Sequence, residues 1–446
     1  MVEISIILSL LFSLFCFTLA AAHSNHVRRM TLLDWSVLAV GGMYGIGWSL
    51  VLLFTQDGRN PAWENWITPF KHYYVVHNLS AFFLLFGLLA GWHLTSSVLR
   101  RAVPPRHHHH AGLGVWNLAF WGLLLLAVSF QGLYTRAYGG YLEVLEYSNL
   151  IRSALFGQAP VNPWSFLRPF GGLAMISAYG FFGVWLSGRR SSSTAFGFLI
   201  SFFFSNYILY SWLGRIGFLV FLLTFILGWI FSRQPNPIKL IALATLLFAT
   251  LLGSAYGVSL WLDLKSADSL VEFLAKELSF PFASFFAQLD RGENIYRGFF
   301  DLLLTPIFLL PSSWWSDWYM SVDQVNTAVI MGAPKGEGGV TGGIPVDLLT
   351  LGLMQLHIFG VLLIGGIFSA ALRALQFVID SIPERGIKAV FEAHVALKFA
   401  VLAIFYAQPN LVVSGNFEFL FSAFFIILVL YLSRIRLAPA SNRSYS

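Results

Sequence analysis

The amino-acid sequence predicts an all-α integral membrane protein that crosses a bilayer about eleven times. Two features of the composition predict this class: hydrophobic residues make up 57% of the 446 residues, and charged residues only 11%. Soluble domains carry roughly a quarter of their residues as charges, so this chain has too few charges to cover a water-facing surface. Its 44 Phe and 15 Trp suit a lipid solvent, where large apolar side chains face acyl tails and Trp collects at the interfaces.

The predicted membrane spans follow from the apolar segments, since a transmembrane helix needs about 20 mainly apolar residues. Several segments are shorter than this or lie close to a neighbour, so the total is about eleven. The candidate segments are residues 2–22, 33–54, 75–95, 115–134, 170–187, 195–212, 218–231, 240–262, 351–378, 396–407 and 420–432.

The first segment has two interpretations, because residues 2–22 end in Thr-Leu-Ala-Ala-Ala, which resembles a signal-peptidase site. A secretory signal begins with basic residues, whereas this segment begins with Glu3, and Arg28 and Arg29 follow it. The sequence therefore favours a retained first helix with its N-terminus outside over a cleaved signal peptide. The single cysteine, Cys16, lies in this segment, so no intramolecular disulfide is possible.

The distribution of Lys and Arg predicts the orientation, because cytoplasmic connections are enriched in them. Alternate connections hold Arg28 and Arg29, then Arg100, Arg101 and Arg106, then Arg189 and Arg190, then Arg233 and Lys239, and finally Arg385 and Lys388. The C-terminal tail adds three more arginines on the same side. We therefore expect one membrane domain, 1–446, with a cytoplasmic C-terminus and with the longer connections 55–74, 135–169 and 263–350 on the outer side.

The connection 263–350 is too long for a simple linker, since structureless loops beyond about 15 residues are usually functional or disordered. Its Phe-Pro-Phe and Trp-Trp sequences need burial or an interface, which argues against disorder. Within it, residues 299–310 are apolar but too short to span, and Pro306 and Pro311 interrupt them. We expect this run to form an interfacial or re-entrant helix at the outer membrane boundary.

Arginines on the outer side are the candidate ligand-binding residues, because an ionisable group at the membrane is costly without a partner. The candidates are Arg215, Arg152, Arg291 and Arg297, whereas Arg59, Arg136 and Arg168 are interpreted as structural. The alternative for each candidate is snorkelling to lipid headgroups. A guanidinium donates a planar pair of N–H groups to two phosphate oxygens, so converging arginines suit a lipid-linked diphosphate.

A glycine-rich stretch, residues 336–345, precedes the span that contains His357. Glycines allow the backbone to approach a ligand closely, although the same composition describes any flexible loop. His357 is either a general base or a hydrogen-bonded packing residue. Asp347 and Glu293 are the other candidate bases.

The sequence gives no reason to expect a metal, a cofactor or a nucleic-acid partner. It contains no Asp-x-Asp pair, Walker motif, dinucleotide-binding glycine pattern or zinc spacing. The basic residues are scattered over short connections rather than gathered on one face, which argues against nucleic acid despite the net charge of +6.

This layout resembles the Wzy-type O-antigen polymerases of the bacterial inner membrane, which have about ten to twelve spans and a large late periplasmic loop. The turn around Arg215 reads Gly-Arg-Ile-Gly, where that family often carries Ser-Arg-Gly. The late loop ends in Gly-Ile-Pro at residues 343–345, followed by Ile-Phe-Gly-Val at residues 358–361, which is similar to the family's Phe-Gly step. The turn departs from the family pattern in its missing serine and its displaced glycine.

The resemblance implies a GT-C-like glycosyltransferase that needs no cofactor and acts on glycans carried by undecaprenyl diphosphate. A growing glycan is transferred from its lipid to an incoming lipid-linked repeat unit, and Arg215, Arg152, Arg291 and Arg297 stabilise the departing diphosphate. His357, Glu293 or Asp347 takes the proton of the acceptor hydroxyl. Membrane lipid is the other expected partner, and the sequence leaves open whether a chain-length regulator binds.

Two alternatives remain at this point. An O-antigen ligase has the same layout and donor but passes the glycan to lipid A core. A polysaccharide transporter or lipid flippase is the rival from another class, although such proteins tend to contain internal repeats, and this sequence has no visible repeat.

Overall fold

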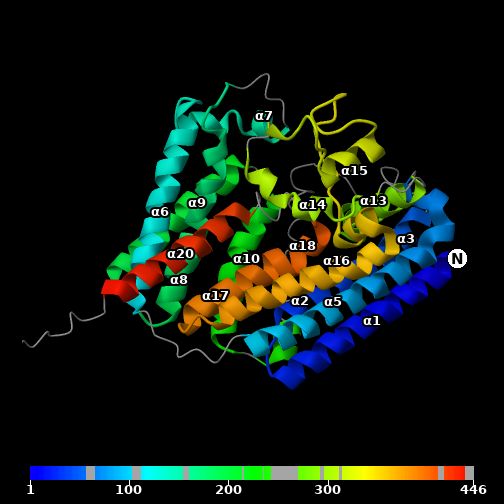
Figure 1. Cartoon of the computed structure of the whole chain (residues 1–446), viewed down its shortest axis with the longest axis horizontal. Helices are drawn as coiled ribbons and strands as arrows, with labels where there is room; N and C mark the ends of the chain where they lie inside the picture. The colour runs from blue at the N-terminus through cyan, green and yellow to red at the C-terminus, as the bar shows by residue number, and fades with distance from the viewer. Residues whose placement is uncertain are drawn as a thin grey trace, which may run out of the picture.

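The computed structural model describes residues 1–56, 66–102, 112–153, 160–212, 215–234, 236–242, 270–291, 296–310, 314–409 and 416–436. Within those residues every regular element is a helix, and no strand is present. Figure 1 shows the long helices packed side by side in one bundle. The all-α class of a polytopic membrane protein is confirmed, since apolar helices satisfy their own backbone hydrogen bonds in lipid.

One half of the bundle combines the N-terminal helices with α16, which comes much later in the chain. α1 packs along α2, and α5 packs along α16. The α5–α16 contact is close because a Cβ atom added to Gly87 would lie only 2.1 Å from the carbonyl oxygen of Leu362. The elements of this half are α1 (Val2–Val27), α2 (Leu32–Gly41), the π-helical η1 (Gly42–Gly47), α3 (Trp48–Gln56), η2 (Thr68–Tyr73), α5 (Tyr74–Ala102) and α16 (Leu348–Asp380).

The other half has a core of aromatic side chains, of which Phe120, Phe181 and Phe221 are fully buried. α17 packs against α8 and α10 in this half, and its continuation η8 packs against α2 in the first half. This helical run therefore joins the two halves. The elements are α6 (Leu113–Arg136), η5 (Ser165–Gly172), α8 (Leu173–Leu186), α9 (Ser192–Ser211), α10 (Arg215–Ser232), α17 (Arg385–Val395), the π-helical η8 (Ala396–Leu402), α18 (Ala403–Phe405) and α20 (Phe417–Arg436).

Among the described residues, seven helical stretches are long and apolar enough to cross a membrane, with mean hydropathy from 1.3 to 2.4. They coincide with the predicted segments 2–22, 33–54, 75–95, 115–134, 170–187, 195–212 and 351–378. The shorter apolar helices Ile216–Ser232 and Phe417–Tyr431 coincide with 218–231 and 420–432. The segment 396–407 falls within η8 and α18, and most of 240–262 lies outside the described residues. The total of about eleven stays a prediction.

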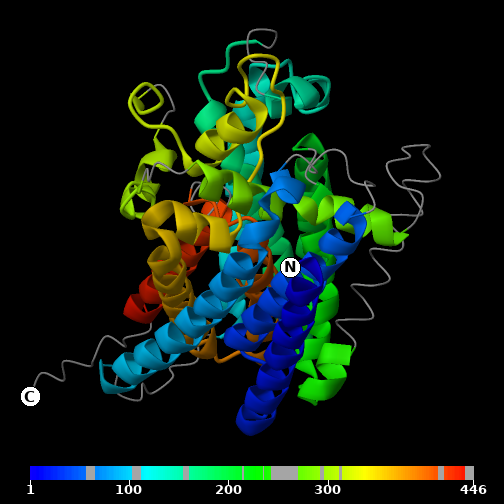
Figure 2. The ribbon, with the colours of Figure 1, turned by 90° about the vertical axis from the view of Figure 1, so that its right-hand side faces the viewer.

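The connections expected on the outer side gather at one end of the bundle. Figures 1 and 2 both show α7 beside α15 at this end, in teal and yellow. The short elements of these connections are η3 (Glu143–Leu145), α7 (Ser148–Ser153), α12 (Leu270–Glu277), α13 (Ser279–Asp290), α14 (Phe300–Leu303), η6 (Thr305–Leu309) and α15 (Val322–Met331).

The late loop buries a helix that the sequence analysis did not predict, while the placement of residues 299–310 at the membrane boundary stays a prediction. Residues 299–310 form only the short turns α14 and η6, and Phe300 and Leu303 are 62% and 72% exposed. Instead α13 enters the core, where Phe282 and Phe286 are fully buried against Trp48. The difference has a physical reason: α13 brings aromatic side chains to a site that other aromatic rings already line, whereas two prolines limit 299–310 to short turns.

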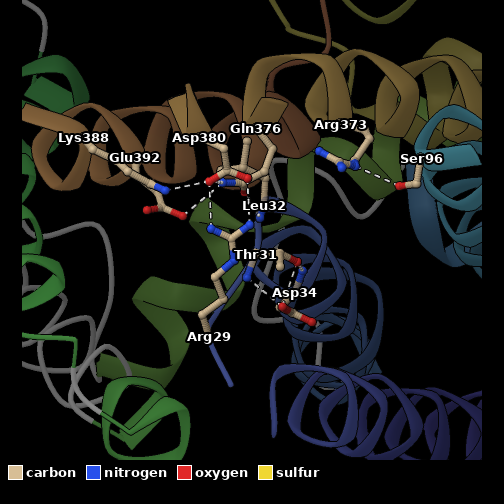
Figure 3. A network of polar contacts seen from close by, with 10 residues as sticks. All are labelled: Arg29, Thr31, Leu32, Asp34, Ser96, Arg373, Gln376, Asp380, Lys388 and Glu392. Atoms are coloured by element: carbon tan, nitrogen blue, oxygen red, sulfur yellow. Dashed lines mark hydrogen bonds and ion pairs between the residues drawn. The ribbon is translucent and has the colours of Figure 1, made fainter. Parts of the chain in front are cut away.

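A polar network secures the opposite end of the bundle, where α16 ends and α17 begins (Figure 3). Arg29 donates two hydrogen bonds of 2.7 Å to the carboxylate of Asp380, which also pairs with Lys388 at 2.8 Å. Gln376 accepts from the backbone N–H of Leu32 and donates to Glu392. Arg29 and Lys388 are among the basic residues that predict the orientation in the membrane. They also tie α16 and α17 to the α1–α2 connection.

Candidate functional site

α16 is interrupted close to its start, although the sequence predicts one continuous helix over 351–378. Leu356 (φ −148°, ψ 40°) and His357 (φ 56°, ψ −145°) are not helical and divide α16 into residues 348–355 and 358–380. The two halves meet at glycines, because a Cβ atom on Gly360 would lie 2.0 Å from the carbonyl oxygen of Gly352. A positive φ is uncommon for a residue with a side chain, and such strain clusters at functional sites.

The interruption frees backbone carbonyls that a continuous helix would use, and the late loop supplies their partners. The backbone N–H of Arg297 donates to the carbonyl of Met354, and that of Gly298 donates to the carbonyl of Gln355, both at 3.1 Å. The loop therefore takes the place of the missing next turn of helix. This contact brings the segment before α14 to the break in α16.

A buried carboxylate, Asp301, holds this arrangement together. It is fully buried and accepts hydrogen bonds from Arg297 Nε at 2.6 Å, Arg297 Nη2 at 2.7 Å and Gln355 Nε2 at 2.8 Å. The hydroxyl of Tyr319 also donates to Asp301, and Arg297 Nη2 donates to the carbonyl of Met320. A charge-assisted bidentate pair with such additional partners fixes the geometry of the break.

These contacts give Arg297 a structural role. Its guanidinium, expected to bind a diphosphate, already donates to Asp301 and to the carbonyl of Met320. Asp301 was not among the predicted functional residues. The spacing of Arg297 and Asp301, four residues apart, is the sequence signal that favours such a pair when the segment is helical.

His357 lies half-buried in the break, with its ring 6.4 Å from that of Tyr296. Within the part of the chain that the structure describes, no hydrogen bond involves its ring. The interpretation of His357 as a packing residue stays open, since its ring lies against that of Tyr296. Its role as a general base stays a prediction.

We expect His357→Gly to raise the thermal unfolding midpoint relative to His357→Ala. Both changes remove the imidazole, but only glycine adopts φ 56°, ψ −145° without strain, which is worth about 1 kcal/mol or more. Thermal unfolding of the full chain in detergent measures the difference. A glycine variant that unfolds at a lower temperature than the alanine variant would contradict the idea of strain at this position.

Asp347 caps the first half of α16 rather than lining an open site. Its side chain is 1% exposed and accepts from the hydroxyl of Tyr44 at 2.6 Å and from the backbone N–H groups of Leu349 and Thr350. The two backbone donors are those of an N-cap, and the hydroxyl of Tyr44 adds a hydrogen bond from another helix. Glu293, the third candidate base, lies outside the described residues.

A second group of residues, which we call the α7 cationic cluster, consists of Arg152, Arg168 and Lys335. Lys335 Nζ donates to the backbone carbonyl of Arg152 in α7 at 2.7 Å. Burial lowers the pKa of Lys335, and the charges of Arg152 and Arg168 lower it further, while Asp323 partly offsets them. Burial is the larger cause of the lowered pKa, and the nearby positive charges of Arg152 and Arg168 add to it.

The α7 cationic cluster has the properties of an anion site. Among the described residues, no carboxylate forms an ion pair with Arg152, Arg168 or Lys335. Lys335 leads into the predicted glycine-rich stretch, where Gly336, Gly338 and Gly339 adopt positive φ. The N–H groups of Gly336, Glu337 and Val340 already donate within this loop, so the cations rather than these amides suit a phosphate-bearing ligand.

The structure places the four predicted arginines in different surroundings. Arg152 belongs to the α7 cationic cluster, Arg297 is paired with Asp301, and Arg291 is exposed at the end of α13. Arg215 begins α10, and its side chain lies outside what the structure describes. No contact between described side chains joins these four residues, so their action on one ligand stays a prediction. Lys335 was not among the residues predicted from the sequence, and Arg168 was interpreted as structural. Only the fold brings both of them close to Arg152.

Comparison with protein-family models, with characterised proteins and with solved structures finds no match to this chain.

Proposed function

We propose that this protein is a glycosyltransferase that joins undecaprenyl-diphosphate-linked oligosaccharide repeat units into O-antigen or a related surface polysaccharide. The reaction takes place at the end of the bundle that carries α7 and α15, which we assign to the periplasmic face of the inner membrane. The observation that carries the proposal is the α7 cationic cluster, whose three cations have no carboxylate paired with them among the described residues.

In this reaction the acceptor hydroxyl oxygen bonds to the anomeric carbon of the donor sugar, and the bond from that carbon to the diphosphate oxygen breaks. The leaving diphosphate gains negative charge as this bond breaks. Arg152, Arg168 and Lys335 stabilise that charge, which is the contribution expected of cations placed before the reaction begins. The hydroxyl proton passes to a base, for which His357, at the break in α16, is our first candidate.

This assignment differs from the one that the sequence suggested. In this proposal Arg297 does not contribute to the diphosphate site, because its Nε and Nη2 already donate to Asp301 and to the carbonyl of Met320. Lys335 and Arg168 take its place beside Arg152. Arg215 and Arg291 remain candidates for a role in binding the glycan or its lipid.

Reconstitution of the purified full chain in liposomes tests the proposal. With lipid-linked repeat units as the sole substrate, and without nucleotide or metal, we expect a ladder of products that differ by one repeat unit. The reason is that the diphosphate-linked donor is already activated and the cations needed to stabilise the leaving group come from the protein.

The other outcomes identify the rival functions. If repeat units stay single until lipid A core is added and are then attached to it, the protein is a ligase. If no glycosidic bond forms but the lipid-linked units move between leaflets, it is a flippase, for which the broken helix α16 is the supporting observation. Either result would contradict the polymerase proposal.

A further inference from the structure

A buried ion pair lies within the bundle, between η8 and the start of α20. Lys398, in the π-helical η8, pairs with Glu418 in the first turn of α20, with 2.5 Å between Nζ and Oε1. The side chain of Glu418 is only 4% exposed and that of Lys398 23%. Ionisable side chains among membrane helices are costly, and they commonly mark paths of ions or protons.

His394, one helical turn before Lys398, has no polar partner at all among the described residues. It is 4% exposed, and both ring nitrogens lack a hydrogen bond. Its ring packs against those of Tyr179, at 4.8 Å, and Phe419, at 5.8 Å. The hydroxyl of Ser422, one turn after Glu418, is likewise buried without a partner. Most buried polar atoms are hydrogen-bonded, so these exceptions need an explanation.

The surroundings of His394 contain few other groups that take up or release a proton. α8 contributes Tyr179, α20 contributes Glu418, and its own helix contributes Lys398. α10, which packs on the same helix, contributes the neutral Thr224 near the hydroxyl of Tyr179. His394 lies four residues before Lys398, about one helical turn, so we expect the flexible ammonium to reach His394 as well as Glu418.

We propose that Glu418, Lys398 and His394 form an intramembrane proton-binding site in which Lys398 changes partner. When a proton from water adds to a carboxylate oxygen of Glu418, Lys398 keeps its own proton but loses its counter-ion. The ammonium then donates to the free ring nitrogen of His394. In this state the imidazole is neutral and accepts a hydrogen bond, and one net positive charge has been added to the bundle.

The backbone around the site supports such a change. η8 is a π-helix that contains Lys398 and begins two residues after His394. π-Helical turns are rare and occur frequently at functional sites. Because η8 packs against α2 in one half of the bundle and Glu418 belongs to α20 in the other, the proton affects the contact between the halves. This inference does not depend on the proposed glycosyl transfer.

Infrared difference spectroscopy of the full chain in lipid nanodiscs tests the site. Lowering the pH should produce the carbonyl stretch of a protonated carboxyl group in apolar surroundings, and Glu418→Gln should abolish it. The exposed Glu337 offers a matched control, since Glu337→Gln should leave the band unchanged. A band that persists in Glu418→Gln, or that fails to appear while the wild-type protein stays folded, would overturn the proposal.

The pH at which this band reaches half of its full intensity, its midpoint, tests the change of partner by Lys398. Lys398→Met removes the counter-ion of the carboxylate and should raise the midpoint by about one pH unit or more, a tenfold change in proton affinity. His394→Phe removes the second acceptor of Lys398, so it should lower the midpoint. An unchanged midpoint in His394→Phe indicates a simple ion pair and refutes the switch. If Glu418→Gln does not accumulate, the wild-type protein labelled with carboxyl-¹³C glutamate replaces it, and the label must shift the band. A band that does not shift would also overturn the proposal.

Discussion

Replacing Lys335 by alanine together with Arg152 by alanine is expected to reduce the rate of polymer formation about 100-fold or more. Removing one preorganised donor from a site of developing negative charge typically costs about 10² to 10³ in kcat. Both residues lie in the α7 cationic cluster, which has no paired carboxylate among the described residues. The assay is the reconstituted ladder of repeat units, with the rate followed at saturating substrate.

The control for this variant is Arg136→Ala, which removes an exposed arginine at the end of α6. It lowers the positive charge at the same end of the molecule without touching the cluster, so the ladder should form at the normal rate. Equal losses in both variants would mean that only the general surface charge matters. Normal polymer from the Lys335 and Arg152 double variant would remove the chemical basis of the proposed function.

Asp301→Ala is expected to lower the stability of the protein by about 3–5 kcal/mol, because it leaves the half-buried guanidinium of Arg297 without its carboxylate. Gln355 and Tyr319 lose an acceptor at the same time. We therefore expect a lower thermal unfolding midpoint and faster proteolysis of the segment 296–320, which Asp301 fastens to the break in α16.

Asp317→Ala provides the comparison, since Asp317 lies in the same segment but is exposed. Its side chain accepts a 3.4 Å hydrogen bond from the hydroxyl of its neighbour Ser316 and is otherwise open to solvent, so little stability should be lost. If Asp301→Ala and Asp317→Ala unfold at the same temperature, the buried network does not hold the loop. The prediction concerns stability alone and stands whether or not the protein is a polymerase.

The class of the fold and most of the apolar helices could be predicted from the amino-acid sequence. Within the described residues, nine of the predicted spans coincide with apolar helices, of which seven are long enough to cross a membrane. This success has a simple cause: a run of apolar residues needs no information about its neighbours to favour lipid over water. The predicted Arg152 and the glycine-rich stretch also lie at the α7 cationic cluster, because charge and glycine content are local properties of the chain.

The contacts between polar residues could not be predicted in this way, because they depend on how the helices pack. The pairing of Arg297 with Asp301 depends on a loop that replaces a missing turn of α16, and Lys335 reaches Arg152 across 183 positions of sequence. The burial of α13 likewise depends on Trp48, far away in the chain. Hydrophobicity is additive along the sequence, whereas the pairing of charges depends on distance in space, and that distance is set only when the helices pack.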